Sequence, residues 1–274
     1  MSARGNMTML MRLLAAIFLW NTFAWAGPLP FESKGDNGSG KTDAPPVRAT
    51  SKNAQTGMEF VFVPGGCFRM GSEKGASDEK PVHEVCVSDF FIGKYEVTQG
   101  QWRRVMGNNP SRFNSCGDDC PVEQVGWNDA QEFVRALSSQ TGKKYYLPTE
   151  AEWEYACRSG GKDETYCGSN TADDVAWYER VLAGKTHLVG QKQPNGLGIY
   201  DMSGNVWEWV QDWSGEYSAM RQQDPSGPAT SSTRVRRGGS WHYGARQSQA
   251  TWRSSGYPDD QALDLGFRIM YPGP

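Results

Sequence analysis

This sequence has no long apolar run, few histidines and no excess of basic residues. Its 274 residues include 3 histidines, and 28 Lys and Arg against 31 Asp and Glu leave a net charge of −3. A mildly acidic chain is a poor candidate for nucleic-acid binding, because phosphates require a basic surface. The one basic cluster, Arg234, Arg236 and Arg237, is better explained as a solvated strand edge or as internal ion pairs. We therefore expect no nucleic-acid partner.

The apolar stretch near the N-terminus is too short to cross a membrane as a helix. It has 11 residues, Leu13 to Phe23, whereas a spanning helix takes about 20. Arg4 and Arg12 precede it, and Ala24-Trp25-Ala26 supplies the small residues of a cleavage site. This layout predicts a secretory signal over residues 1–26, a periplasmic or secreted protein, and no membrane span after signal removal. No cysteine follows the stretch, which argues against a lipid-anchored start.

No CxxC motif occurs, and no histidine lies close in sequence to a cysteine pair. A zinc-type site is therefore disfavoured. Six cysteines follow the signal, and an even number in an oxidising compartment predicts disulfides, although six cysteines allow 15 pairings. The simplest expectation is that each cysteine pairs with its neighbour in the sequence, which gives the disulfides Cys67–Cys86, Cys116–Cys120 and Cys157–Cys167.

A segment of low hydrophobicity separates the signal from the remainder of the chain. Residues 27–56 are rich in Gly, Pro, Ser, Lys and Asp, with too few apolar groups to offset the entropy of ordering. We expect a disordered linker there. One large domain is expected over residues 57–272.

Helix signals are confined to the first half of the domain. Thr98 is placed to cap a helix that runs to Met106, and Asn128 with Gln131 to cap a second. Residues 149–152 form the capping box of a third. Strand composition occurs over residues 58–64, 67–70 and 85–95.

Beyond residue 160 the periodicity fades, and the chain becomes rich in glycine and tryptophan. The sequence has 11 tryptophans, whose large rings need burial and whose N–H groups need partners. These patterns predict an α+β domain with little regular secondary structure, long ordered loops and an aromatic core.

Eight phrases in order carry a family resemblance over roughly residues 57–271. The phrases are FVPGGCFRMGS (62–72), KYEVTQGQW (94–102), NPSRF (109–113), PVEQVGWNDAQEF (121–133), YYLPTEAEWEYACR (145–158), PNGLGIYDMSGNVWEWVQDW (194–213), RVRRGGSW (234–241) and DLGFRI (264–269). With these phrases the chain resembles the formylglycine-generating-enzyme, or sulfatase-modifying-factor, family, which includes pyoverdine-maturation and ergothioneine-synthase relatives. The resemblance implies an irregular α+β domain related to C-type lectins.

Residues 201–208 have the composition of a calcium loop. Calcium takes six to eight oxygen ligands, and Asp201 and Glu208 supply two carboxylates. An extended path would let the carbonyls of Gly204 and Val206 join them. The resemblance places a calcium site on these four residues; the alternative is that the carboxylates bind loop amides without a metal. The family's second calcium site does not carry over, because residues 184–187 lack an acidic ligand.

The cysteine pair that the family uses for catalysis is absent. The resemblance implies that two cysteines after an RGGS-type motif bind copper(I), and Tyr243 and Ser248 stand at those positions. A phenol and a hydroxyl are not soft ligands, so copper and formylglycine generation are not expected. Ser240 and His242 lie nearby, but a histidine beside a tyrosine is more often ordinary packing. We leave catalytic residues unassigned.

The sequence is compatible with three candidate functions. The first is a binding or accessory module of the cell envelope, which recognises a peptide, protein or glycan without turnover. The second is an oxidoreductase of the pyoverdine-maturation type. The third, formylglycine generation on sulfatases, is disfavoured by the missing thiols.

Overall fold

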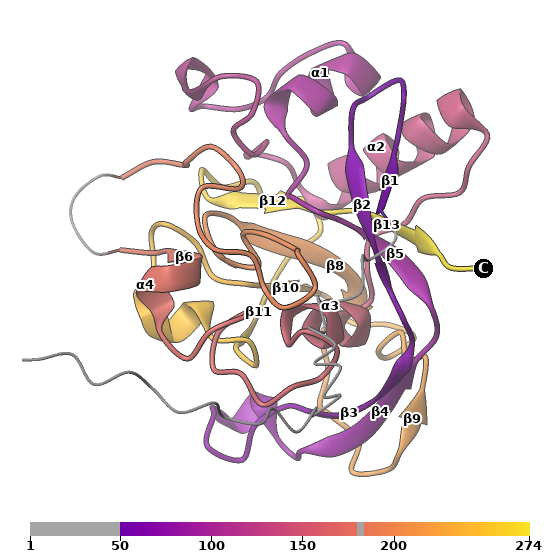
Figure 1. The fold of residues 1–274 in the computed structure, drawn as a ribbon, viewed down its shortest axis with the longest axis vertical. Helices are drawn as coiled ribbons and strands as arrows, with labels where there is room; N and C mark the ends of the chain where they lie inside the picture. The colour runs from indigo at the N-terminus through magenta and orange to yellow at the C-terminus, as the bar shows by residue number, and fades with distance from the viewer. Residues whose placement is uncertain (1–49, 180–183) are drawn as a thin grey trace, which may run out of the picture. The chain divides into compact units, whose positions relative to one another are not determined.

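The computed structural model describes residues 50–179 and 184–274 (Figure 1). The predicted signal, residues 1–26, and most of the predicted linker lie outside these residues. The linker prediction was wrong at its end, because Thr50–Lys52 forms strand β1 and the side chain of Thr56 is 2% exposed. β1 pairs with the strand that follows, which supplies backbone hydrogen bonds that the composition alone does not reveal. No helix among the described residues is long and apolar enough to cross a membrane.

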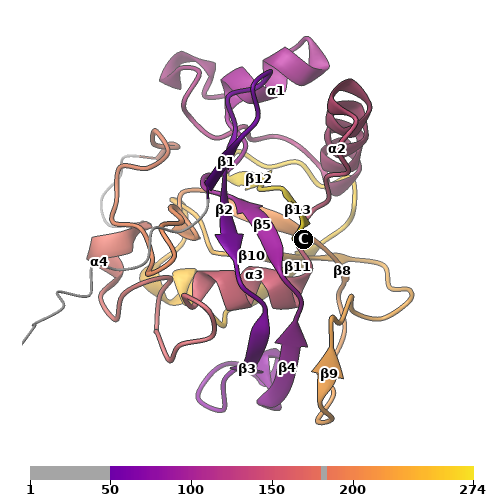
Figure 2. The ribbon, with the colours of Figure 1, turned by 45° about the vertical axis from the view of Figure 1, so that its right-hand side comes forward.

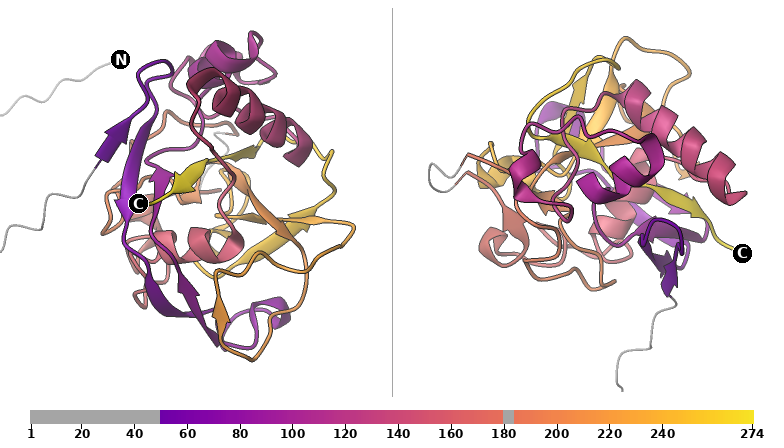
Figure 3. Two further views of the ribbon diagram at one scale, coloured as in Figure 1. Left: turned by 90° about the vertical axis from the view of Figure 1, so that its right-hand side faces the viewer. Right: turned by 90° about the horizontal axis from the view of Figure 1, so that it is seen from above.

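A four-stranded antiparallel sheet brings the two ends of the domain together, with strand order β1-β2-β5-β13. In Figure 3 the C-terminal strand lies beside the first strands. A second sheet extends the hairpin β3–β4 by the short parallel strand β9. The bounds are β2 Glu59–Val63, β3 Gly66–Met70, β4 His83–Val87, β5 Phe90–Gly93, β9 Gln222–Gln223 and β13 Met270–Pro272.

A third sheet, of order β11-β10-β8-β12, carries the strands from which the candidate site is built. β12 runs parallel to β8, and β10 and β11 run antiparallel to their neighbours. A two-stranded parallel sheet, β6–β7, lies just before β8 in the chain. The bounds are β6 Ala176–Trp177, β7 Ser203–Gly204, β8 Trp207–Trp213, β10 Arg234–Arg237, β11 Arg253–Gly256 and β12 Leu265–Phe267.

Helices α1 (Gln99–Met106) and α2 (Trp127–Thr141) pack together at one end of the domain (Figure 2). Thr98 caps α1 as predicted, because its Oγ1 accepts from the amide of Gln101. The predicted cap of α2 was wrong. The N-cap is Gly126, two residues before the predicted Asn128, and the Asp129 carboxylate accepts from the amide of Gly126 at 2.8 Å.

Helix α3 (Glu150–Cys157) contacts both the β3–β4 hairpin and strands β8 and β10. Thr149 and Glu152 form the predicted capping box, with the Glu152 side chain 2.7 Å from the Thr149 amide. Seven of the eight residues of α3 are buried, all except Glu152, since the helix lies among these strands. The remaining short helices are α4 (Ala172–Val175) and the 3₁₀ turns Ser77–Glu79, Asn114–Cys116 and Ala245–Ser248.

The core is aromatic, as predicted. Trp153, Trp207 and Trp209 are among the largest fully buried side chains, and two clusters of buried apolar residues fill the domain. The indole of Trp209 donates to the carbonyl of Val125 at 3.0 Å, which offsets the cost of burying its N–H group. The irregular α+β class predicted from the sequence is confirmed.

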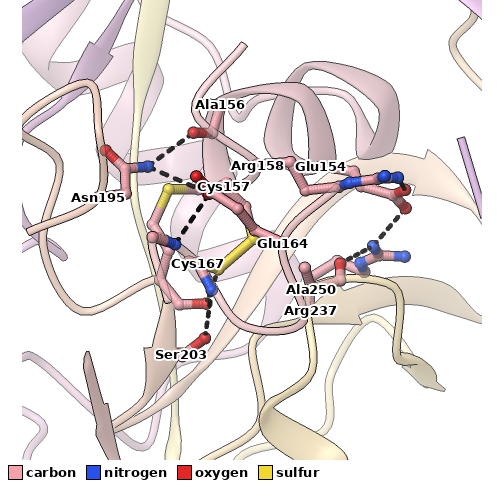
Figure 4. Close-up of a disulfide and its surroundings, with 12 residues drawn as sticks. Glu154, Ala156, Cys157, Arg158, Glu164, Cys167, Asn195, Ser203, Arg237 and Ala250 are labelled. Carbon is pink, nitrogen blue, oxygen red and sulfur yellow. Dashed lines mark hydrogen bonds and ion pairs between the residues drawn. A yellow bond between two sulfur atoms is a disulfide. The ribbon is translucent and has the colours of Figure 1, made fainter. Parts of the chain in front are cut away.

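Three disulfides join the sequence neighbours Cys67–Cys86, Cys116–Cys120 and Cys157–Cys167. Figure 4 shows the third of them, which ties the end of α3 to the loop that follows. The side-chain amide of Asn195 donates to the carbonyls of Ala156 and Cys157, at 2.7 and 3.2 Å. These contacts fix the C-terminal end of α3.

The basic cluster on β10 is internal. Arg237 is fully buried and forms ion pairs with Glu150 and Glu154 at 2.8 and 2.7 Å (Figure 4 draws the Glu154 contact). The guanidinium of Arg234 lies 3.7 and 3.4 Å from the rings of Trp127 and Trp213, between them. The interpretation as internal ion pairs therefore holds for Arg237.

Candidate functional site

Asp201 stands in a left-handed backbone conformation, with φ of 57°, directly before β7. Its Oδ2 accepts from the amide of Gly190 at 2.6 Å. Its Oδ1 is buried and has no hydrogen-bond partner among the described residues. Burial raises the pKa of this carboxyl to about 6 against the lowering effects of the Gly190 amide and Arg268. One oxygen of a predicted ligand is thus uncommitted.

Glu208, the second predicted carboxylate, is held by a buried arginine. Arg268 donates through Nε and NH2 to the two carboxylate oxygens, both at 2.6 Å. The indole N–H of Trp153 donates to Oε2 at 2.6 Å. All three side chains are fully buried. Glu208 is therefore the acceptor of a bidentate ion pair, the strong form of such a contact.

Glu96 is a third carboxyl group in this cluster, and the sequence patterns did not identify it. Its oxygens accept from the side-chain amide of Asn205 at 2.7 Å and from the amide of Val206 at 3.1 Å. Burial raises its pKa well above the usual value, and the charges of Asp201 and Glu208 add to the effect. Three carboxyl groups thus surround one guanidinium, that of Arg268.

Gly204 permits the close packing of this loop. Its φ is +78°, and a Cβ there would lie 2.0 Å from the carbonyl oxygen of Trp177. Asn205 then bridges to a distant segment, because its Oδ1 accepts from the amide of His187 at 3.0 Å. Val206 is fully buried. The predicted calcium residues Asp201, Gly204, Val206 and Glu208 therefore lie in one buried region.

Ser240 lies between the exposed residue His242 and a second pair of carboxyl groups, those of Asp264 and Glu123. Its Oγ donates to Asp264 at 2.6 Å and accepts from the amide of His242 at 3.2 Å. The carboxyl group of Glu123 interacts electrostatically with that of Asp264. Burial raises the pKa of Glu123 to about 7, and the charge of Asp264 adds to this rise, while two backbone hydrogen bonds lower the pKa in part. Oε2 of Glu123 is buried without a partner in the described part of the chain.

Tyr243 and Ser248 differ sharply in exposure. Tyr243 is 37% exposed, and its ring meets the ring of Trp207 edge-on at 5.7 Å. Ser248 is fully buried, and its Oγ has no hydrogen-bond partner among the described residues. A Cβ on Gly239 would lie 2.7 Å from that Oγ. Of the two positions, only 243 reaches the surface.

Comparison with known proteins identifies the family. Residues 46–271 match the Sulfatase-modifying factor enzyme 1-like domain. The chain belongs to this family. Chaperone protein LppX of Paenibacillus barcinonensis is 35% identical, over 81% of this chain and 92% of its own length. The formylglycine-generating enzyme of Streptomyces coelicolor is 31% identical, over 76% of this chain and 87% of its own.

A solved structure supports the same assignment. Treponema denticola variable protein 1 matches with a TM-score of 0.76 and 31% identity, over 82% of this chain and 99% of that one. The family resemblance drawn from the eight sequence phrases is thereby confirmed.

This sulfatase-modifying-factor domain presents an aromatic surface, the Trp241 surface, made by Trp241, His242 and Tyr243, and the buried ring of Trp207 packs against Tyr243. His242 and Tyr243 are exposed, and the ring of His242 lies edge-on to the rings of both its neighbours. The indole N–H groups of Trp207 and Trp241 are buried without an acceptor in the described residues. Buried donors are normally paired, so these two are exceptions that lie below the exposed rings of His242 and Tyr243.

Proposed function

We propose that this chain is an exported binding or accessory protein of the cell envelope, which recognises a peptide, protein or glycan without turnover. The observation that carries the proposal is the replacement of the family's two cysteines by Tyr243 and Ser248. Neither side chain supplies a thiolate, and Ser248 is fully buried. The relative LppX is named a chaperone protein, which favours an accessory role. Three disulfides and the predicted signal favour export.

The Trp241 surface is the proposed recognition site. The exposed aromatic side chains of His242 and Tyr243 suit the apolar faces of peptides and glycans. Binding to peptide and glycan arrays should be lost in Tyr243→Ala and retained in Tyr146→Ala. Tyr146 is a matched control because it is 42% exposed and pairs with β13, on another sheet. Equal binding by both variants would place the recognition site elsewhere.

A sulfatase-derived cysteine peptide should remain unmodified by this protein, even with copper added. The expectation follows because the copper(I) site needs soft sulfur ligands. Mass spectrometry of the peptide detects conversion of the thiol to an aldehyde. The double variant Tyr243→Cys with Ser248→Cys is the comparison, and copper(I) binding gained by it alone assigns the loss to these two positions. Aldehyde formed by the parent would refute the proposed lack of turnover.

An oxidoreductase of the same family is the alternative. Buried Ser240 accepts a hydrogen bond from the amide of His242, whose ring meets that of Tyr243 on the Trp241 surface, and Asp264 accepts a hydrogen bond from Ser240. Oxygen uptake with phenolic or siderophore-like substrates tests it, and uptake that Tyr243→Phe abolishes would favour this function over binding.

Calcium is the proposed structural cofactor of this domain. The buried carboxyl groups of Glu208, Glu96 and Asp201 all interact electrostatically with the guanidinium of Arg268, and Asp201 keeps an uncommitted oxygen. Bound calcium supplies two positive charges to oxygen ligands. Asp201 and the carbonyls of Gly204 and Val206 are the residues to hold it, with Glu208 shared with Arg268. Copper is not proposed.

Asp201→Asn should remove a calcium-dependent rise in melting temperature. The parent should melt about 5 °C higher in saturating calcium than in chelator. The variant keeps an oxygen for the Gly190 amide but loses the charge, so its two melting temperatures should coincide. Asp163→Asn, at a fully exposed carboxylate, should behave as the parent does. A parent that melts identically in calcium and chelator contradicts the metal proposal.

A further inference from the structure

The Cys67–Cys86 disulfide lies on the β3–β4 hairpin, at the opposite end of the domain from α1 and α2 (Figure 2). The two residues are directly opposed in the antiparallel register. Cys67 is exposed, whereas Cys86 is 4% exposed. In the Cys157–Cys167 disulfide, by contrast, both residues are buried. An incoming thiol can therefore reach the sulfur of Cys67 from solvent.

A guanidinium group lies against the sulfur atoms of this disulfide. Arg221 NH2 is 3.2 Å from Sγ of Cys86 and 3.8 Å from Sγ of Cys67. Arg221 Nε is held by Glu84 at 2.6 Å. The Glu84 carboxylate also lies within 4.8 Å of both sulfurs, so its charge offsets part of the arginine's effect. Arg221 also donates a hydrogen bond to the sulfur of Cys86, which a carboxylate cannot do.

The sulfurs of the other two disulfides meet groups of the opposite polarity. Sγ of Cys116 lies 3.6 Å from the carbonyl oxygen of Thr186, and Sγ of Cys167 lies 3.0 Å from that of Met202. A neighbouring cation stabilises a thiolate and lowers the pKa of the thiol, whereas a carbonyl oxygen does not. A thiol of lower pKa also leaves faster in exchange. The three disulfides should therefore differ in reactivity.

We propose that Cys67–Cys86 is a thiol–disulfide exchange site that takes two electrons from a dithiol. The observations that carry it are the exposed position of residue Cys67 and the guanidinium of Arg221 beside the sulfur of Cys86. This activity is separate from the proposed recognition function, because it uses neither Tyr243 nor Ser248. The site fits an exposed dithiol of a protein or peptide, or a small dithiol.

The exchange proceeds in two balanced steps. A thiolate of the dithiol attacks Sγ of Cys67, the Cys67–Cys86 bond breaks, and its electron pair goes to Sγ of Cys86 as a thiolate beside Arg221. The second thiol of the dithiol, after losing its proton, attacks its own sulfur in the mixed disulfide and releases Cys67 as a thiolate. The dithiol is oxidised to a disulfide and releases two protons. The protein gains two electrons, and its thiolates take up protons according to their pKa.

Titration with reduced and oxidised dithiothreitol tests the site in the full-length protein. Free thiols are alkylated at each ratio, and mass spectrometry reports each cysteine peptide separately. Cys67 and Cys86 should become alkylated at a ratio of reduced to oxidised reagent at least tenfold lower than the other four cysteines require. Opening of all three disulfides at one ratio would overturn the proposal.

Arg221→Met separates the role of the guanidinium from that of exposure. It removes the charge and keeps an unbranched side chain, so reduction of Cys67–Cys86 should slow at least threefold at low salt. Arg221→Lys should retain part of the parent rate. Arg135→Met is the matched control, since the Arg135 side chain on α2 is 67% exposed, as is that of Arg221. Equal rates in Arg221→Met and Arg135→Met, with both folded by circular dichroism, would refute the role of Arg221.

Discussion

Arg268→Met should destabilise the domain by about 3–5 kcal/mol at pH 7, the usual cost of leaving a buried charge without its partner. Arg268 is fully buried and binds both oxygens of Glu208 at 2.6 Å. It also donates to the carbonyls of Gly93 and Tyr200, each at 3.0 Å. The substitution leaves these acceptors without their donor. Urea unfolding followed by tryptophan fluorescence measures the loss.

Arg135→Met is the matched control for Arg268→Met. Arg135 is an arginine on α2 with a side chain 67% exposed, 3.9 Å from Glu132. Its replacement should change stability by less than about 0.5 kcal/mol. Adding Glu208→Gln to Arg268→Met should recover part of the loss, because the neutral amide removes the unpaired charge. Equally small losses of unfolding free energy in both single variants would mean that the buried ion pair does not stabilise the third sheet.

The sequence predicted features that depend on near neighbours. Thr98 lies next to the helix it caps, and Thr149 and Glu152 lie within one helical turn. The Cys67–Cys86 pair was found by the same logic, because a hairpin brings the two strands back together. Such contacts depend on local geometry and on residue type, both of which a pattern records.

Contacts between distant segments were not predictable in the same way. Glu208 meets Arg268 60 residues later, and Glu96 meets Asn205 109 residues later. Both partners lie within phrases that carried the family resemblance, yet the phrases do not say which side chains meet. The burial of Ser248 beneath Gly239 likewise depends on the packing of the 3₁₀ turn at Ala245–Ser248 against β7. Tertiary structure decides these features.

Buried carboxyl groups outside the predicted site show the same limit. Asp212, on β8, is 4% exposed, and its Oδ2 accepts from the amide of Glu150 at 2.8 Å. It lines a cavity of about 260 Å³ with Tyr217 and Arg253. Burial raises its pKa to about 8, and the charge of Glu150 adds to the rise. At neutral pH this carboxyl group is therefore mostly protonated in the folded protein.

Asp212→Asn should stabilise the domain relative to the parent as the pH rises. The unfolded carboxyl has a pKa of about 3.9, so between that value and about 8 folding takes up a proton, and the contribution of Asp212 to stability falls with increasing pH. An asparagine does not titrate and still offers an oxygen to the Glu150 amide. The advantage of the variant should grow by on the order of 2–4 kcal/mol between pH 5 and pH 8. Urea unfolding of both proteins across this range measures it.

Asp224→Asn provides a control of opposite sign. Hydrogen bonds from Gln223 and Ser88 lower the pKa of exposed Asp224, outweighing the raising effect of its slight burial. A lowered folded-state pKa contributes stability above the unfolded value, which is lost as the pH falls through the folded one. Asp224→Asn should therefore be less stable than the parent at pH 7, with a deficit that shrinks in acid. A parent and an Asp212→Asn variant with parallel pH profiles would show that Asp212 is ionised in the folded domain, and that Arg253 or water in the adjoining cavity stabilises its charge.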